Sequence, residues 1–502
     1  MSLRGSRRRL LRIGASAIGV FFVLFLFTAY QLPLAHQRQQ PLLEPQSEFQ
    51  SSSEPQQPAT DKQPGAEIEN APVSALDLPP EYTEVKEPPP ACADRFGTSY
   101  ITKLRDSATE YCTLESSGGL TCFHSKTSSS RVDSFCFARG ALFNQDERVF
   151  SLGCGLRDLD GLGVPKYKEF TNYWYDTGPG HTLDKAVRLE DNTSSIIVPE
   201  SIPSYTLLLK REGANNIWHS LMEIFSMTLT LDVLRMTQHP DEPLPFFTNY
   251  DIENTQVLVL DDLEEGPYFD LWSLFADKPT LRINDPALPF LNTSFENLIV
   301  PLNGGGNPLW QGDWEIHTCD DSPLLRTFSH RVLNHFDFVP DTPREQPPEI
   351  ILTFINRTST RHLINVEEYL EHLQSEVPHI KIQSIDFAAI SFVEQLAVAQ
   401  ETDVLVGVHG AGLTHGMFLP HHSAMVEILP PDLNHKGFRN VAALLDHSYF
   451  SAHASKAGTE DKPEKRGDWH EDDVFIEKDK FMDIMNVAIK SMYNRGSRNY
   501  DV

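Results

Sequence analysis

Two histidines and two glycines stand close together in the C-terminal third of the chain. Glycines in a tight turn let backbone N–H groups approach a phosphate, and a helix that begins at the turn adds the positive end of its dipole. Histidine side chains can also donate hydrogen bonds to phosphate oxygens. The pattern therefore predicts a phosphate-binding turn made of His409, Gly410, Ala411, Gly412, Leu413, Thr414 and His415. A glycine-rich loop that only reverses the chain is the alternative.

An acid and two arginines extend this candidate phosphate site. Glu427 lies near the end of the next apolar run, about where an acid meets a ribose hydroxyl in nucleotide-binding folds. Arg357 and Arg361 follow another apolar run, and a guanidinium group matches phosphate geometry bidentately. We predict that these arginines bind a diphosphate, with solvated arginines at a helix start as the alternative.

A histidine and a glutamate offer acid–base chemistry in the middle of the chain. His219 and Glu223 are four residues apart on a predicted helix, so they share a face. A carboxylate beside an imidazole suits a general base that deprotonates a hydroxyl group. A buried polar pair that ties the helix to its neighbours is the alternative. Asp261 and Asp262 could bind a metal, but adjacent acids on a strand point in opposite directions.

Several function classes are disfavoured. The chain of 502 residues carries a net charge of −28, which argues against general nucleic-acid binding. It contains no Gly-x-Ser-x-Gly, the motif of a serine nucleophile elbow. It also lacks the Gly-Lys-[Ser/Thr] of a P-loop, which disfavours kinase and ATPase chemistry.

The turn requires a strand before it and a helix after it. Residues 404–408 are apolar and β-branched, which predicts a buried parallel strand. A capping box at Ser391 and Glu394 opens a helix before that strand, and Pro420 ends the one after the turn. Helix, strand, turn and helix in this order indicate a doubly wound α/β domain.

Similar patterns recur on both sides of this stretch. They predict strands at 194–198, 204–209, 256–260, 349–355, 381–385 and 424–428, and helices at 217–236, 365–374 and 477–492. Two successive α/β units of comparable size are what an enzyme with two lobes and a central cleft would show.

The N-terminus predicts a membrane anchor. Residues 1–12 are rich in arginine. Residues 13–30 are apolar and as a helix would be about 27 Å long, enough to cross a bilayer. The positive flank keeps residues 1–12 cytoplasmic. Residues 31–91 are rich in Pro, Gln, Ser and Glu, which predicts a disordered stalk. A cleaved signal peptide is the rival interpretation of the apolar run.

Cysteines and sequons fit a lumenal location for the remainder. Five of the six cysteines fall between residues 92 and 154, which predicts disulfides of undetermined pairing rather than a zinc site. Asn192 and Asn292 lie in glycosylation sequons. A third sequon, at Asn356, adjoins Arg357, and a glycan there would crowd the predicted phosphate site.

The motifs resemble those of glycosyltransferase family 61. The resemblance lies in Glu394-Gln395-Leu396, Thr402-Asp403, the stretch 407–415 and Phe418-Leu419-Pro420, and covers roughly residues 200–455. Asn216, His219 and Glu223 match a family pattern in which Asp replaces the glutamate. Asp270 and Trp272 match a family Asp-x-Trp, and Arg357, Arg361, Ile364 and Asn365 fit its arginine segment.

The resemblance implies an α/β fold of GT-B type, with two Rossmann-like lobes and a central cleft. We expect a Cys-rich subdomain at 92–165, an acceptor lobe at 166–340, a nucleotide-sugar donor lobe at 341–475, and a C-terminal helix and tail at 476–502. His219, Glu223 and Asp270 would be catalytic. The phosphate-site residues above, with Arg357, Arg361 and Glu427, would bind the donor.

The implied reaction is inverting transfer of N-acetylglucosamine or xylose from a UDP-sugar, the co-substrate, to a hydroxyl of a protein or glycan acceptor. Protein O-linked N-acetylglucosaminyl transfer is favoured, in a Golgi or endoplasmic reticulum membrane protein of type II. The resemblance implies no required cofactor. It leaves open whether the reaction uses a divalent cation (Mn²⁺ or Mg²⁺), because Pro279 stands where relatives carry a second acid. A catalytically inactive, glycan-binding or scaffold member of the family and a lumenal metallohydrolase are the alternatives.

Overall fold

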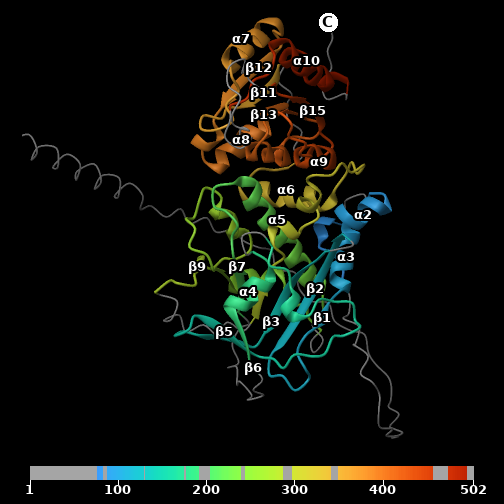
Figure 1. The fold of residues 1–502 in the computed structure, drawn as a ribbon, viewed down its shortest axis with the longest axis vertical. Coiled ribbons are helices and arrows are strands. Elements are labelled where there is room, and N and C mark those ends of the chain that lie inside the picture. Colours follow the sequence, from blue (N-terminus) through green and yellow to red (C-terminus); the bar gives the residue numbers. More distant parts are fainter. Residues whose placement is uncertain are drawn as a thin grey trace, which may run out of the picture. The chain divides into compact units, whose positions relative to one another are not determined.

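The described part of the chain belongs to one compact unit, Glu69–Val502. The computed structural model describes residues 76–82, 88–128, 131–173, 177–190, 204–238, 243–286, 297–340, 349–455 and 473–494 (Figure 1). The predicted tail, anchor and most of the stalk lie outside these ranges, as do Asn192, Asn292 and the predicted strand 194–198. Within these ranges, no helix combines the length and apolar composition needed to cross a bilayer.

A mixed sheet of seven strands forms in the first part of the described chain. Its order is β1 (Thr109–Glu110), β2 (Gly119–Ser128), β3 (Arg131–Arg139), β10 (Asn297–Val300), β7 (Tyr205–Leu209), β8 (Thr255–Val259) and β9 (Leu281–Arg282). Pairing is antiparallel from β1 to β10 and parallel from β10 to β9. The strands of the predicted Cys-rich segment thus share a sheet with those of the predicted acceptor lobe.

A five-stranded, fully parallel sheet forms in the second part. Its order is β12 (Ile380–Ile385), β11 (Ile350–Ile355), β13 (Val404–Val408), β14 (Ala424–Leu429) and β15 (Ser448–His453). β13 is central and buried along its whole length. A third sheet joins β4 (Ala141–Asn144), β5 (Val149–Gly153) and β6 (Val187–Glu190). The described residues therefore form a mixed α/β structure with several sheets.

Helices cover both faces of the five-stranded sheet. On one face, α7 (Val366–Glu376) and α10 (Lys478–Asn494) pack against Val404, Val406 and Val426. On the other face, α8 (Phe392–Glu401), α9 (Gly437–Leu444) and the 3₁₀ helix η10 (Ala411–Phe418) join the core that also contains α5 (Ile217–Arg235) and α6 (Pro323–His335). Figure 1 shows α8 and α9 at the side of this sheet that faces α6. The core that contains α5, α6, α8, α9 and η10 is therefore continuous between the two large sheets.

Helix α5 is the central element of that shared core. Nearly every residue from Ile217 to Leu234 is buried, as an apolar composition around the whole circumference predicts. Asn216 caps it, since its side chain accepts a hydrogen bond from Trp218 N at 3.0 Å. The other α-helices within the described residues are α2 (Pro90–Phe96), α3 (Thr98–Asp106) and α4 (Pro179–Ala186).

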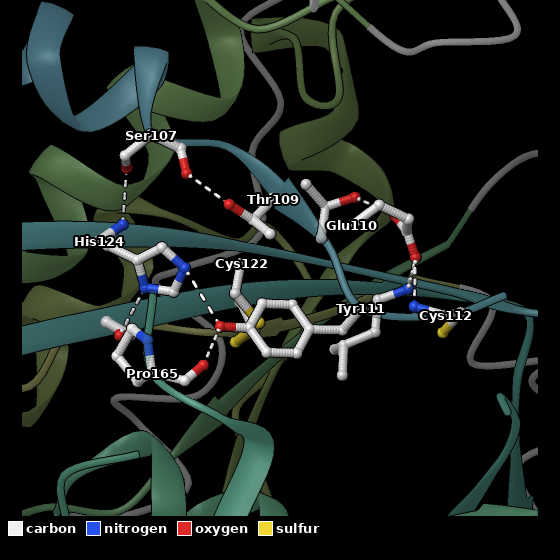
Figure 2. Close-up of a disulfide and its surroundings, with 12 residues drawn as sticks. Ser107, Thr109, Glu110, Tyr111, Cys112, Cys122, His124 and Pro165 are labelled. Atoms are coloured by element: carbon white, nitrogen blue, oxygen red, sulfur yellow. Dashed lines mark hydrogen bonds between the residues drawn. A yellow bond between two sulfur atoms is a disulfide. The ribbon is translucent and has the colours of Figure 1, made fainter. Parts of the chain in front are cut away.

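The six cysteines form three disulfides, as the sequence predicts without the pairing. The bonds are Cys92–Cys319, Cys112–Cys154 and Cys122–Cys136. Figure 2 shows the surroundings of Cys122. The Tyr111 hydroxyl donates to Pro165 O at 2.6 Å and lies 3.3 Å from His124 Nε2. These contacts join the loop at Pro165 to Tyr111 and to His124 on strand β2.

The predicted elements within the described residues are confirmed apart from their ends. The strands predicted at 204–209, 256–260, 349–355, 381–385, 404–408 and 424–428 are β7, β8, β11, β12, β13 and β14. The predicted helices at 217–236, 365–374 and 477–492 are α5, α7 and α10. The helix after the glycine turn is of the 3₁₀ type.

Candidate active site

The glycine turn lies at the carboxyl end of the central strand β13. His409 continues the ladder, because its N–H donates to Ile428 O of β14 at 2.9 Å. Gly410 then adopts φ +156°, and Leu413 N donates to Gly410 O at 3.0 Å to start η10. Ala411 and Gly412 are the partly exposed residues of the turn. Ligands of open parallel sheets gather at such strand ends.

Both predicted arginines pack against this turn. A Cβ atom at Gly410 would lie 2.5 Å from Arg357 Nη1 and 3.2 Å from Arg361 Nη2, so a side chain there would displace them. Arg357 is held in place by Thr360, since its Nε donates to the carbonyl at 2.9 Å and its Nη2 to Oγ1 at 3.0 Å. Burial lowers the pKa of Arg357, against the opposing charge of Asp386. The structure therefore gathers two guanidinium groups at one glycine.

Glu427 does not face outward from the turn as a ribose ligand would. Its side chain is buried, Oε1 lies 2.5 Å from His409 Nδ1, and Oε2 accepts a hydrogen bond from the Tyr449 hydroxyl. Each carboxylate oxygen therefore has one partner within the protein, and the ribose contact stays a prediction. Glu427 instead orients His409. Burial lowers the pKa of His409, which Glu427 opposes and His435 and Arg361 reinforce.

His415 also lies behind the turn rather than on it. Its Nδ1 is 2.8 Å from Gly412 O, and its Nε2 is 2.8 Å from Gln395 Oε1. Burial lowers its pKa to about 4. A phosphate contact by His415 is not supported by this position, and its contacts instead brace η10. Leu413 and Thr414 are likewise buried, so the turn meets solvent through Ala411 and Gly412.

Aromatic rings connect the turn to helix α5. The His409 ring centroid lies 5.5 Å from that of Phe438 on α9, and Phe438 lies 5.7 Å from Trp218. Trp310 then contacts both Trp218 and His219, with centroid distances of 6.1 and 4.9 Å. The two chemistry-bearing regions predicted from the sequence are therefore neighbours around one aromatic cluster.

A second connection between these regions was not predicted. His435 Nε2 lies 3.3 Å from Asp313 Oδ2, and the His435 ring is 4.9 Å from the His409 ring. Lys436 N donates to Asp313 O at 2.7 Å. Asp313 and His435 lie 122 residues apart in loops, where neither periodicity nor a motif marks them. Their pairing is a product of the tertiary fold.

The structure brings a second carboxylate to the predicted pair of His219 and Glu223. The carboxylate that faces His219 Nδ1, at 3.1 Å, belongs to Glu212. Glu223 is buried below it, and its Oε1 accepts a hydrogen bond from Glu212 N at 2.5 Å. Burial raises the pKa of Glu223 well above its usual value, and the neighbouring Glu212 raises it further. Glu223 also lines a small cavity of about 20 Å³ with Lys210 and Asn303.

The remaining acids serve other contacts. Asp261 forms a buried ion pair with Arg211, with 2.8 Å between Oδ1 and Nη2, while Asp262 is exposed. Asp270 is exposed on η5 (Phe269–Leu274). Burial lowers the pKa of His335 at the end of α6, and the charge of Asp270 opposes this shift. The described contacts therefore join Asp270 to α6 and not to His219. In the residues the structure covers, no three His, Cys, Asp or Glu side chains gather as a metal site.

Comparison with known proteins adds an independent finding. Residues 217–426, which contain α5, β13 and the glycine turn, match the family model described as Glycosyltransferase 61. The chain is also similar to proteins named EGF domain-specific O-linked N-acetylglucosamine transferase. The Drosophila melanogaster protein is 27% identical over 232 residues, which are 44% of this chain and 40% of the relative.

Vertebrate proteins of the same name give similar values. The Xenopus laevis protein is 25% identical over 280 residues, covering 55% of this chain and 49% of the relative. The Mus musculus protein is 24% identical over 260 residues, covering 51% and 45%. The chain thus spans less than half the length of each of these relatives.

Proposed function

We propose that this chain, which carries a glycosyltransferase 61 domain at residues 217–426, transfers a sugar from a UDP-sugar to a hydroxyl group of a protein or glycan acceptor. The donor sugar is N-acetylglucosamine or xylose, and transfer of N-acetylglucosamine to a protein hydroxyl is favoured by the names of the relatives. The parallel five-stranded sheet and the parallel half of the seven-stranded sheet support two lobes of the GT-B type.

The observation that carries this proposal is the convergence of Arg357 and Arg361 on Gly410. A nucleotide sugar leaves as a diphosphate, which needs positive charge near the breaking bond. Two guanidinium groups beside a glycine turn at a strand end provide that charge together with exposed backbone at Ala411 and Gly412. We therefore assign the diphosphate to this turn.

The proposed transfer is a single displacement. The acceptor oxygen forms a bond to the anomeric carbon, and the bond from that carbon to the diphosphate oxygen breaks with its electron pair. His219 takes the hydroxyl proton, since its side chain remains partly accessible beside Trp310. Arg357 and Arg361 stabilise the departing diphosphate. Configuration at the anomeric carbon inverts, because one displacement occurs.

We also propose a lumenal location with an N-terminal membrane anchor at 13–30, in the Golgi or endoplasmic reticulum. The apolar run and its arginines motivate the anchor. Three disulfides favour an oxidising compartment.

Donor binding tests the proposal. Calorimetric titration of the lumenal part with UDP and UDP-sugars should give binding that Arg357→Ala weakens by roughly 10- to 100-fold, because a charge-assisted bond of about 1.5–3 kcal/mol is lost. His409→Ala should weaken binding as well. Arg188→Ala is the control, since this arginine is exposed and pairs with Glu147 on the three-stranded sheet. Equal affinity in all variants would refute the assignment.

Turnover separates an enzyme from an inactive relative. Released UDP and modified acceptor should appear with at least one donor. Retained UDP-sugar affinity without turnover over a panel of donors and acceptors would favour the glycan-binding or scaffold alternative.

A further inference from the structure

The carboxylate of Glu212 is buried without a hydrogen-bond donor within the described residues. Its side chain is fully buried, and within the described residues no hydrogen bond reaches either oxygen. The ion-pair contact that it makes is with His219 Nδ1 at 3.1 Å. Burial of a carboxylate without hydrogen-bond donors is unfavourable unless a positive charge compensates it. The imidazolium that forms when His219 takes the acceptor proton would supply that charge.

The loop that carries Glu212 is fixed by its neighbours. Arg211 N donates to Asp261 Oδ2 at 2.8 Å, and Arg211 Nη2 lies 2.8 Å from Asp261 Oδ1. Glu212 N donates to Glu223 Oε1 at 2.5 Å. The backbone on either side of the Glu212 side chain is therefore anchored, so its direction toward His219 is imposed by the fold.

We propose that Glu212 is a positioning residue for His219: its carboxylate, 3.1 Å from Nδ1, favours the tautomer with the proton on Nδ1, so that Nε2 receives the acceptor proton. This inference rests on the proposed transfer reaction. The hydroxyl proton moves to Nε2 while the acceptor oxygen bonds to the anomeric carbon and the diphosphate leaves with the electron pair of the broken bond. The imidazolium so formed is stabilised by the Glu212 carboxylate.

Other charged and titratable groups lie around Glu212. The charges of Arg211 and Asp261 act on Glu223, next to Glu212. The charges of Glu212 and Asp313 both act on Tyr173. Asp313 in turn pairs with His435. The pH dependence of the reaction therefore reflects the charges of several neighbouring groups: Glu212, Glu223, Arg211, Asp261, Tyr173, Asp313 and His435.

Glu223 provides a matched control. Burial raises its pKa, and glutamine would keep the carbonyl oxygen that accepts from Glu212 N. Glu223→Gln and Glu212→Gln are thus the same chemical change at adjacent carboxyls. Only the second changes the carboxylate that lies 3.1 Å from His219 Nδ1.

The first measurement is the pH dependence of kcat. A base that must be deprotonated gives an acidic limb, and an adjacent anion moves that limb to higher pH. Glu212→Gln should move the limb to lower pH by roughly 1 to 3 units and lower the plateau about 10- to 100-fold. Glu223→Gln should leave the limb in place, and Glu212→Asp should restore part of the rate. A uniform loss of rate without a shift in Glu212→Gln would overturn the proposal.

The second measurement does not depend on turnover. Nitrogen-15 NMR of labelled histidine should show the Nδ1–H tautomer at His219 in the wild type and a mixture in Glu212→Leu. An unchanged tautomer in that variant would contradict the proposal even if no acceptor is found. UDP affinity should stay the same in all three Glu212 variants, and absence of UDP binding in the wild type would refute the proposed function instead.

Discussion

Gly410 must be a glycine because two guanidinium groups occupy the space of a side chain. A methyl group there would lie 2.5 Å from Arg357 Nη1 and 3.2 Å from Arg361 Nη2, and the backbone has φ +156°. The position of the Glu427 side chain is equally constrained, since its carboxylate accepts hydrogen bonds from both His409 and Tyr449. Neighbouring side chains therefore fix the geometry of the turn.

The protonation of His409 should change when a diphosphate binds. Because Glu427 accepts at Nδ1, a neutral His409 presents a lone pair at Nε2, and burial lowers its pKa. A diphosphate nearby would raise that pKa and turn Nε2 into a donor. UDP binding should then take up about one proton per site at a pH between the two pKa values, and affinity should fall as pH rises.

Calorimetry in buffers of different ionisation enthalpy measures this uptake. The observed enthalpy should depend on the buffer in the wild type and not in His409→Gln. Buffer-independent enthalpy in the wild type would show that His409 stays neutral in the complex.

At the scale of elements, the disulfides differ in what they connect. Cys92–Cys319 joins α2 to the loop before α6 across 227 residues of sequence, whereas Cys122–Cys136 joins adjacent strands across 14. The loop before α6 also carries Asp313, which reaches His435. The long-range bond therefore stabilises a segment that the two regions of the site share.

Removal of these bonds should have unequal effects on stability. In the loop-entropy view each doubling of loop length adds about 0.6 kcal/mol, so the ratio of 227 to 14 predicts a difference of about 2.4 kcal/mol. Urea unfolding of Cys92→Ala/Cys319→Ala and Cys122→Ala/Cys136→Ala double variants measures it. A larger loss in the second variant would show that strand packing, and not chain entropy, dominates.

The elements could be predicted because their signals are local. The β-branched run of β13, the capping box of α8 and the apolar α5 each require only a short window of sequence. The partner of His219 could not be predicted in this way. Helical spacing suggested Glu223, whereas the fold of the preceding loop brings Glu212 to the ring. The burial of Glu427 likewise depends on Tyr449 of β15, 22 residues away.

For the molecule as a whole, buried histidines should make stability depend on pH. Burial lowers the pKa of His124 and of His415 to about 4. Between about pH 6.5 and 4 the unfolded chain binds protons that these folded side chains do not, so stability falls as pH falls through this window. Each histidine contributes a slope of about 1.4 kcal/mol per pH unit there.

Urea unfolding at pH 5 and 6 tests this slope. His415→Gln should reduce the pH dependence by about 1.4 kcal/mol per unit while lowering stability at pH 7, because the brace between Gly412 and Gln395 is altered. His421→Gln is the control, since this side chain is exposed. An unchanged slope in His415→Gln would mean that the buried ring becomes protonated in the folded state.

Glycan mapping of the secreted lumenal part tests the proposed compartment. We expect occupancy at Asn192 or Asn292 and none at Asn356, whose Oδ1 is buried beside Arg357. Full occupancy of Asn356 would place that segment away from any ligand site.

The most direct test of the account is a crystal structure of the lumenal part with UDP at saturating concentration. We predict the diphosphate within hydrogen-bond distance of Arg357 or Arg361 and of backbone N–H groups of the turn at 410–412. A diphosphate bound elsewhere, with that turn empty, would contradict the central claim.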